Sequence, residues 1–233
     1  VALQPSAAQT MWEIGARDEV VGMPVGPYTA DLEGYREKTS VVGADGFTTN
    51  VEAVVNLSPD LVLAPNVTSV ETVRQLRRAG LTVYHFREAG SIEDVYAKTL
   101  LTGQLTGNCA GAAERVDWMR ERIDRVREAV REEDRPTVVY PLGGGVVPGS
   151  GTFLHEIVST AGGRNLAAEV GISGYGQLSA EVIVAEDPQW IILNEQLPLS
   201  AIHLEAYNQT TAIQTDQVVR LNPNYANQPA PRI

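Results

Sequence analysis

The residues able to perform chemistry are few and are spread along the chain. His85, His155 and His203 lie far apart, and none belongs to a His-Glu-x-x-His or comparable cluster of metal ligands. His155 stands beside Glu156 on an expected helix, a pair that is more often structural than catalytic. The single Cys109 excludes an intramolecular disulfide and a thiolate zinc site, and we interpret it as a small buried residue. We therefore expect no bare metal site and no intrinsic cofactor.

One glycine-rich stretch has the context of an anion-binding loop. Gly143-Gly144-Gly145-Val-Val-Pro-Gly149-Ser150-Gly151-Thr152 follows an expected strand and precedes an expected helix. It lacks the lysine of a phosphate loop and the glycine spacing of a dinucleotide site. Ser150 has Pro148 where a nucleophile elbow needs glycine, and spacing assigns it no His or Asp. The stretch is interpreted as a loop whose backbone approaches a ligand, or as a flexible turn.

Composition excludes partners with dense negative charge. The 29 acidic and 18 basic residues give a formal net charge of -11, which repels nucleic acids and anionic membrane surfaces. Lys38 and Lys98 are the only lysines, and acids are spread along the whole chain, a pattern typical of adaptation to high salt. No apolar run approaches the roughly 18 residues of a membrane helix, and the first residues lack the basic start of a signal peptide. We expect any export signal or membrane anchor to lie outside this sequence.

Short apolar runs alternate with amphipathic stretches, which predicts an α/β fold with parallel sheets covered by helices. Plausible helix N-caps are Thr49, Ser91 and Ser179. The expected strands are Val20 to Met23, Leu61 to Ala64, Thr82 to Phe86, Thr137 to Tyr140, Trp190 to Leu193 and Gln217 to Leu221.

The longest helical pattern runs from about Ala110 to Glu132, between the two halves of the chain. Its apolar residues recur at spacings of three and four: Val116, Met119, Ile123, Val126 and Val130. At 1.5 Å per residue such a helix is about 35 Å long, enough to span two lobes. A long helix lying on one sheet is the alternative.

The two halves also contain an internal echo. Glu52-Ala-Val-Val-Asn-Leu-Ser-Pro59-Asp-Leu-Val-Leu-Ala matches Glu181-Val-Ile-Val-Ala-Glu-Asp-Pro188-Gln-Trp-Ile-Ile-Leu at a constant offset of 129 residues. Each copy is expected to form a short helix, a proline turn and a buried strand. Because such units are common in α/β proteins, the echo indicates either two related lobes or a chance likeness.

Several motifs, taken in order, resemble one known family. They are Leu3-Gln4-Pro5-Ser6-Ala-Ala-Gln-Thr-Met-Trp-Glu-Ile-Gly15, Asp18-Glu-Val-Val-Gly22, Val42-Gly43, Val51-Glu52-Ala-Val, Ser58-Pro59-Asp60-Leu-Val-Leu-Ala and Ala161-Gly162-Gly163-Arg-Asn165. In this order they resemble the periplasmic-binding-protein family of cobalamin, ferric siderophore and heme importers. The likeness covers essentially the whole chain and ends at Pro231-Arg232-Ile233, where family members usually continue into a final helix. The sequence is therefore expected to stop before that helix.

The resemblance implies two sheet-centred lobes joined by one rigid helix, with a ligand cleft between them. The expected divisions are an N-terminal lobe of residues 1–104, a backbone helix of residues 105–134 and a C-terminal lobe of residues 135–233. Matching carboxylates of the cobalamin receptors, one per lobe, dock onto arginines of the membrane permease, and Glu52 and Glu181 occupy those positions. Thr49 with Glu52 also fits a capping box, and Glu181 sits in a first helical turn, so capping and docking can coexist.

The resemblance places the ligand against strand-to-helix loops of both lobes. Tyr175 lies six residues before Glu181, where the cobalamin receptors carry an aromatic residue. Asn66 alternatively begins the glycosylation sequon Asn66-Val-Thr68, which would exclude a binding role. The expected binding residues are Gln4, Pro5, Ser6, Tyr28, Phe47, Pro65 and Asn66 in the first lobe and Thr152, Tyr175 and Tyr225 in the second.

The sequence indicates the class of ligand less directly than it indicates the family. Trp12, Trp118 and Trp190 are expected to pack inside the protein, which weakens the argument for a corrinoid. By loop position only Arg87 and Arg164 could meet an anionic ferric siderophore, so a neutral or weakly charged chelate fits better.

We expect a monomeric, extracytoplasmic, membrane-anchored receptor that passes a corrinoid to an ABC-importer permease and performs no catalysis. Ferric siderophores and heme are the alternatives within the family. A chelatase using the same cleft, or a surface interaction module without small-molecule affinity, is the alternative outside it.

Overall fold

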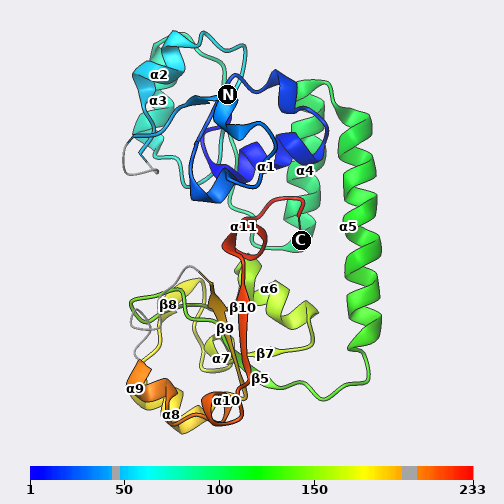
Figure 1. Ribbon diagram of the computed structural model, residues 1–233, viewed down its shortest axis with the longest axis vertical. Helices are drawn as coiled ribbons and strands as arrows, with labels where there is room; N and C mark the ends of the chain where they lie inside the picture. Colours follow the sequence, from blue (N-terminus) through cyan, green and yellow to red (C-terminus); the bar gives the residue numbers. More distant parts are fainter. Residues whose placement is uncertain (44–47, 196–203, 233) are drawn as a thin grey trace. The chain divides into compact units, whose positions relative to one another are not determined.

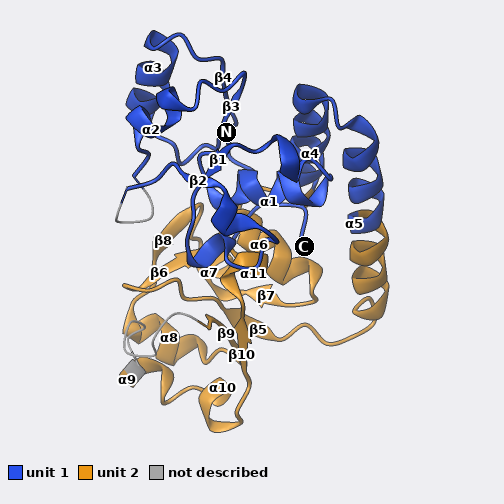
Figure 2. Ribbon diagram, turned by 45° about the horizontal axis from the view of Figure 1, so that its top comes forward, with its two compact units in different colours: residues 1–89, 93–119, 228–233 blue, residues 90–92, 120–227 orange. Residues whose placement is uncertain are grey.

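A computed structural model of the chain describes residues 1–43, 48–195 and 204–232. The chain forms two compact units (Figure 2). Unit 1 contains residues 1–89, 93–119 and 228–233, and unit 2 contains residues 90–92 and 120–227. The division falls inside α5 (Cys109–Ala129), so this helix contributes its first half to unit 1 and its second half to unit 2.

Unit 1 contains α1 to α4 (Figure 1) and is built around short parallel strands, which are labelled in Figure 2. β1 pairs in parallel with β2, and β3 pairs in parallel with β4. Ala2 lies between these pairs, because its N–H donates to the Gly22 oxygen at 3.0 Å and it forms a parallel bridge with Leu63. The elements are α1 (Pro5–Glu13), β1 (Gly22–Met23), β2 (Thr39–Ser40), α2 (Val51–Asn56), β3 (Val62–Ala64), α3 (Val70–Arg78), β4 (Val83–His85) and α4 (Ile92–Thr106), with 3-10 turns at Arg17–Glu19, Pro27–Thr29 and Tyr35–Glu37.

Unit 2 contains a four-stranded parallel sheet in the order β10-β9-β5-β7, and a separate antiparallel pair, β6 with β8. The six strands expected from the sequence are all present in the two units, each shortened or extended by one or two residues. The elements are β5 (Thr137–Val139), β6 (Val146–Pro148), α6 (Phe153–Thr160), β7 (Arg164–Asn165), α7 (Leu166–Glu169), β8 (Tyr175–Gln177), α8 (Ala180–Glu186), β9 (Trp190–Asn194), α9 (Leu204–Tyr207), α10 (Thr211–Gln214), β10 (Val218–Leu221) and α11 (Pro223–Ala226).

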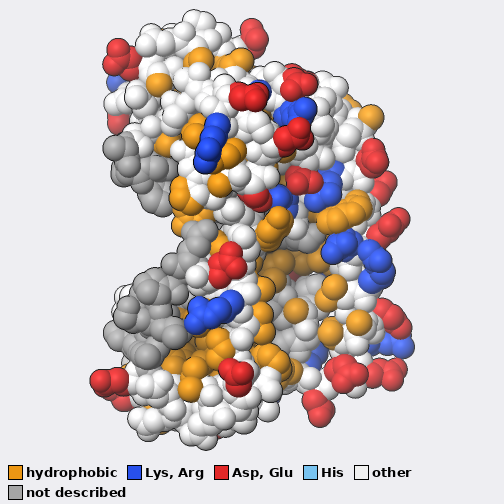
Figure 3. Space-filling view, in the orientation of Figure 1, with side chains coloured by type: hydrophobic (Ala, Val, Ile, Leu, Met, Phe, Trp, Pro, Cys, Tyr) orange, Lys and Arg blue, Asp and Glu red, His pale blue; other side chains and the backbone are white. Residues whose placement is uncertain are grey.

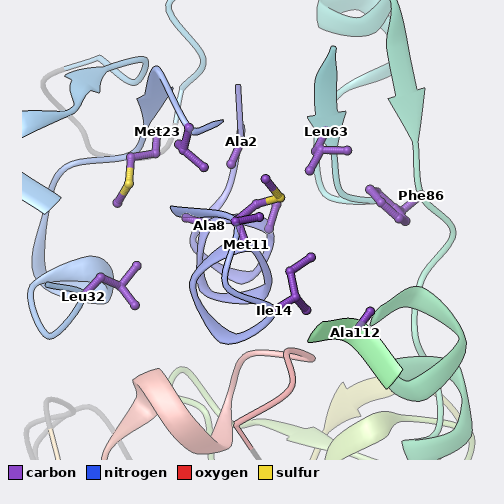
Figure 4. Close-up of a cluster of buried hydrophobic side chains, with 12 residues drawn as sticks. Ala2, Ala8, Met11, Ile14, Met23, Leu32, Leu63, Phe86 and Ala112 are labelled. Carbon is purple, nitrogen blue, oxygen red and sulfur yellow. The ribbon is translucent and has the colours of Figure 1, made fainter. Parts of the chain in front are cut away.

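Apolar side chains on the helices cover the strands. In unit 1, Met11 and Ile14 of α1 pack with Leu63 of β3 and with Phe86 in a cluster that also includes Met23 (Figure 4). A second cluster lies between α2, α3, β3 and β4. A cluster centred on Val139, Leu166, Ile183 and Ile191 forms the core of unit 2. Burial of this apolar area is the main favourable contribution to folding of each unit.

The long helix is present, and its predicted apolar face is correct over half of its length. Val116, Met119 and Ile123 are buried, but Val126 is 40% exposed. The helix ends at Ala129, three residues before the predicted end. The prediction failed at Val126 because periodicity identifies a helix face but does not tell how far a packing partner extends along it.

The echoed segments fold alike. Asn50 and Ser179, 129 residues apart, cap α2 and α8 by accepting the backbone N–H groups of Ala53 and Val182. Ser58 and Asp187, again 129 residues apart, have φ values of 46° and 42°, a left-handed conformation that non-glycine residues rarely adopt. Proline follows each of them, and then β3 or β9, which pairs in parallel with β4 or β10.

Two local predictions were wrong. Thr49 does not cap α2, since Val42 and Thr49 form an antiparallel bridge that holds Thr49 extended one residue too early, and Asn50 caps the helix instead. Cys109 is exposed at the start of α5, where it has little packing around it. Ser179 was correctly predicted as the N-cap of α8.

The last residues of the chain belong to unit 1, where buried cations hold them. The Arg232 guanidinium, 10% exposed, pairs with Glu13 at 3.2 Å and with Asp31 at 2.8 Å. Arg115 pairs with the same Glu13 at 2.9 Å and lies 3.7 Å above the Trp118 ring. Lys98 donates from Nζ to the Pro229 oxygen at 3.0 Å. Polar contacts therefore fix this segment, together with the burial of Ala230.

Charge elsewhere lies mainly at the surface. Figure 3 shows acidic side chains scattered over one face of the molecule, with basic side chains between some of them. Within the described parts of the chain, no helix has the length and apolar character needed to cross a membrane.

The buried Lys98 predicts a pH-dependent stability. Burial lowers the pKa of Lys98 from 10.5 to about 8, so between these values the native state has released a proton that the unfolded chain still binds. The free energy of unfolding therefore rises with pH across this window. We expect Lys98→Met to remove roughly 2 kcal/mol of the rise between about pH 7.5 and about pH 9.5 in urea titrations. Lys38→Met, which changes the other lysine, should keep it, and an unchanged rise in Lys98→Met would contradict the assignment.

The matched left-handed corners predict opposite responses to glycine. Ser58→Gly relieves an unfavourable backbone conformation and should stabilise the protein by about 0.5 kcal/mol after the entropy cost of glycine. Asp187→Gly relieves the same strain but removes two hydrogen bonds of 2.6 Å. The Asp187 carboxylate accepts one from the Thr211 N–H and the other from the Thr211 hydroxyl. The thermal midpoint of Asp187→Gly should therefore fall. A fall in both midpoints would show that relief of backbone strain does not stabilise these corners, and a rise in both would show that it outweighs the loss of the Thr211 hydrogen bonds.

Candidate functional site

In unit 1, the carboxyl ends of the parallel strands carry most of the expected binding residues. Gln4 follows Ala2 and Leu3, Tyr28 follows β1, and Pro65 follows β3. The Leu3 N–H donates to the Leu63 oxygen at 3.0 Å, which places the first and third of these loops on neighbouring strands. The Gln9 side chain donates to the Tyr28 oxygen at 3.2 Å, which ties the Tyr28 loop to α1. The structure thus brings these residues to one edge of unit 1.

These residues differ in what they present to solvent. Gln4, Pro5 and Tyr28 are half-buried and Asn66 is exposed, while Pro65 is buried and Ser6 is only 4% exposed. The side chain of Ser6 therefore packs at the start of α1. The remaining expected residue of this group, Phe47, lies outside the described residues.

Sequence reasoning missed one apolar residue at the same edge. A turn, closed by the Thr68 N–H donating to the Pro65 oxygen at 2.9 Å, leaves Val67 70% exposed. Thr68, the third residue of the possible sequon, is 3% exposed. The sequence could have indicated this exposure, because Val67 is an apolar residue within a Pro-Asn-x-Thr turn. Turns of this kind rarely bury their central side chains.

In unit 2, two of the three expected binding residues present aromatic rings. Tyr175 begins β8 and is 51% exposed, and Tyr225 follows β10 in α11 and is 45% exposed. Thr152 is buried, and its hydroxyl accepts the His155 N–H at 3.2 Å and donates to the Gly149 oxygen at 2.8 Å. Its hydrogen-bonding groups thus serve the N-terminus of α6.

The glycine-rich stretch forms the turn that enters β6. Gly143, Gly144 and Gly145 all have positive φ, at 105°, 58° and 78°, so a side chain at any of them would strain the backbone. A Cβ at Gly149 would lie 2.1 Å from the Ile172 oxygen, because the two segments approach closely. This part of unit 2 therefore presents backbone rather than side chains.

The described side chains at these edges form no reactive constellation. Ser150 donates to the Ile172 oxygen at 3.3 Å and has no histidine partner. His155 Nδ1 lies 3.2 Å from the Asn165 amide nitrogen. Burial raises the pKa of the Tyr140 phenol, which donates to Asn227 Oδ1 at 2.5 Å. Among the described residues, no group of three or more His, Cys, Asp or Glu is placed to hold a metal.

The two arginines considered as contacts for an anionic ligand lie at different ends of their strands. Arg164 begins β7, where its guanidinium donates to Thr137 Oγ1 at 2.6 Å and lies 3.5 Å from Glu169. It therefore lies at the amino end of the sheet, away from the loops that follow the strands. Arg87 follows β4 and is exposed.

Glu52 and Glu181 occupy equivalent exposed positions. Each is the second residue of its helix, α2 or α8, where a carboxylate interacts favourably with the helix N-terminus. A hydrogen bond with the Ser179 side chain, together with one to its own backbone N–H, lowers the pKa of Glu181. Both groups are therefore available to a cationic partner without losing packing.

The chain resembles known proteins along its whole length. A cobalamin-binding protein of Halobacterium salinarum is 48% identical over 243 aligned residues, which cover this whole chain and 65% of the relative. The periplasmic vitamin B12 binding protein BtuF of Vibrio cholerae has a TM-score of 0.81 at 23% identity, covering 99% of this chain and 90% of that one. The apo heme-binding protein RhuT of Roseiflexus sp. RS-1 has a TM-score of 0.85 at 20% identity, covering 99% and 92%.

At such identities the two structures establish the fold, and their ligands do not discriminate between a corrinoid and heme. The chain spans about 65% of the length of the Halobacterium relative. The profile of the periplasmic binding protein family matches residues 1–232. The chain therefore belongs to the periplasmic binding protein family, a family of binding proteins rather than enzymes.

Proposed function

We propose that this chain is the extracytoplasmic receptor of an ABC importer and that it captures a corrinoid of the cobalamin type. The observation that carries the proposal is the 48% identity, along the whole chain, to a protein named for binding cobalamin. Because a solved heme-binding protein has the same fold, heme is the second candidate ligand.

The proposed ligand contacts are residues at or beside the strand-to-helix loops of each unit. Tyr28, Tyr175 and Tyr225 supply flat apolar area that loses little entropy on binding, which suits a macrocycle. Gln4, Pro5, Pro65 and Asn66 add polar and rigid contacts, and Phe47 is retained from the sequence pattern. Ser6 and Thr152 act through the backbone of the helices that they begin, because their side chains are buried.

The chemistry of the edges supports binding without turnover. A chelatase needs titratable groups that converge on the metal centre, and among the described residues the edges supply phenols, amides and glycines. We propose no resident metal or cofactor, and the chelate is cargo. A membrane anchor holding the receptor at the cell surface is part of the proposal, and a Bacillus subtilis relative, 26% identical, is named as a lipoprotein.

We propose that Glu52 and Glu181 dock onto cationic side chains of the permease. The support is their exposure and their equivalent places on two helices that fold alike. Charged contacts at a transient interface favour fast association and fixed orientation, which a receptor that must repeatedly bind and leave its transporter requires.

Ligand titration tests the proposed function. We expect cobalamin to raise the thermal midpoint and to change the intrinsic fluorescence saturably in high salt, because a ligand that binds only the folded state stabilises it. Heme and ferric siderophores serve as the competing ligands. If heme alone stabilises the protein, heme replaces the corrinoid as the proposed ligand. If no chelate changes the thermal midpoint or the fluorescence, an interaction module is favoured instead.

Charge removal tests docking separately from capture. Uptake should be lost in cells whose own copy of the gene carries Glu52→Ala together with Glu181→Ala, while the purified variant keeps its ligand affinity. Glu186→Ala, an exposed glutamate at the other end of α8, is the matched control and should leave uptake unchanged. A parallel loss of affinity and uptake would assign the glutamates to ligand binding or folding instead.

A further inference from the structure

Most basic side chains of this acidic protein have partners within it. Within the described parts of the chain, four exposed arginines make no hydrogen bond, ion pair or ring contact, namely Arg78, Arg87, Arg135 and Arg220. With 29 acids against 18 bases in the whole chain, an arginine without a partner is not explained by a shortage of acidic residues.

The position of Arg87 separates it from the other three. Arg78 ends α3, where a cation interacts favourably with the helix C-terminus, and Arg135 precedes β5 at the amino end of its sheet. Arg220 lies within β10. Arg87 is the second residue after β4. Among the two described residues that directly follow each parallel strand, Arg87 is the only basic one.

The chain beneath Arg87 is firmly held. The Phe86 N–H donates to the Ala64 oxygen at 2.8 Å, and the Phe86 ring is buried against Tyr84 with a centroid distance of 4.8 Å. The Lys98 ammonium lies 5.7 Å from the centre of the same ring. Glu88, the next residue, is exposed and forms no ion pair with Arg87. A fixed backbone thus carries a guanidinium whose donors are all available.

We propose that Arg87 binds an anionic substituent of the captured chelate, specifically the phosphodiester of a corrinoid nucleotide loop; this inference rests on the proposed function. A guanidinium matches two phosphate oxygens with two parallel N–H donors. One unpaired cation at the unit 1 edge suits a ligand with one anionic group. A ferric chelate with several negative charges would leave most of them without a partner. Arg87 is thereby a specificity-determining residue rather than a general contact.

The test compares two corrinoids that differ in this group. Cobalamin carries the nucleotide loop with its phosphodiester, and cobinamide lacks both. We expect Arg87→Gln to weaken cobalamin binding roughly tenfold, as loss of one charge-assisted contact does, and to change cobinamide binding less than about twofold. Arg87→Lys should restore part of the loss, because an ammonium keeps the charge without the paired donors. Arg78→Gln, an exposed arginine without a partner in the same unit, is the matched control and should bind both ligands as the unchanged protein does.

The outcomes distinguish this inference from the proposed function. If the unchanged protein binds neither corrinoid, the proposed function fails and the inference falls with it. If the unchanged protein binds both and Arg87→Gln weakens both equally or neither, the function stands and the phosphodiester contact is overturned. A cobalamin-selective loss in Arg220→Gln, with Arg87→Gln unaffected, would also overturn it by moving the contact to β10.

Discussion

Parallel pairing of short strands is the constraint on which each unit depends. Because neighbouring strands run in the same direction, the chain must cross back between them, and every loop that follows a strand emerges at the same edge. In unit 1 the bridge from Ala2 to Leu63 aligns the start of the chain with β3. In unit 2 the register of β5, β9 and β10 does the same for Tyr140 and Asn222. Residues far apart in sequence thereby share one surface, and that surface is available for a ligand.

The two units connect a short helix to the following strand in the same way. Each turns from a short helix into a buried strand through a short connection, residues 57–61 in unit 1 and residues 187–189 in unit 2. Each does so with a capped helix start, a left-handed corner and a proline. Ser58 and Asp187 accept unfavourable backbone angles because proline follows and the next strand is fixed by pairing. The helices so formed carry Glu52 and Glu181 as exposed second residues, so the two local structures are equivalent.

Buried charge helps to hold the end of the chain. Arg232, Arg115 and Lys98 converge on the last residues of the described chain and fix them to unit 1. Burying these cations is costly, and their carboxylate, carbonyl and aromatic partners offset that cost. Arg87 differs from these three cations, since it is exposed and its guanidinium has no partner in the described structure. It differs from the other unpartnered arginines because it directly follows a parallel strand.

The sequence by itself determined the α/β class, the six principal strands, the long helix and the family, because alternating apolar runs and ordered motifs are local properties of the chain. Gln4 and Tyr28 follow parallel strands as the family resemblance implied, and Tyr225 lies in α11 after β10, but Tyr175 begins strand β8 and does not lie in a loop. Only the tertiary structure decided which side chains the loops present: it buried Ser6 and Thr152, exposed Val67 and Val126, and moved Arg164 to the amino end of its sheet. The reason is physical. Periodicity encodes which face of an element is apolar, whereas exposure depends on which other segment packs there, and that segment is distant in sequence.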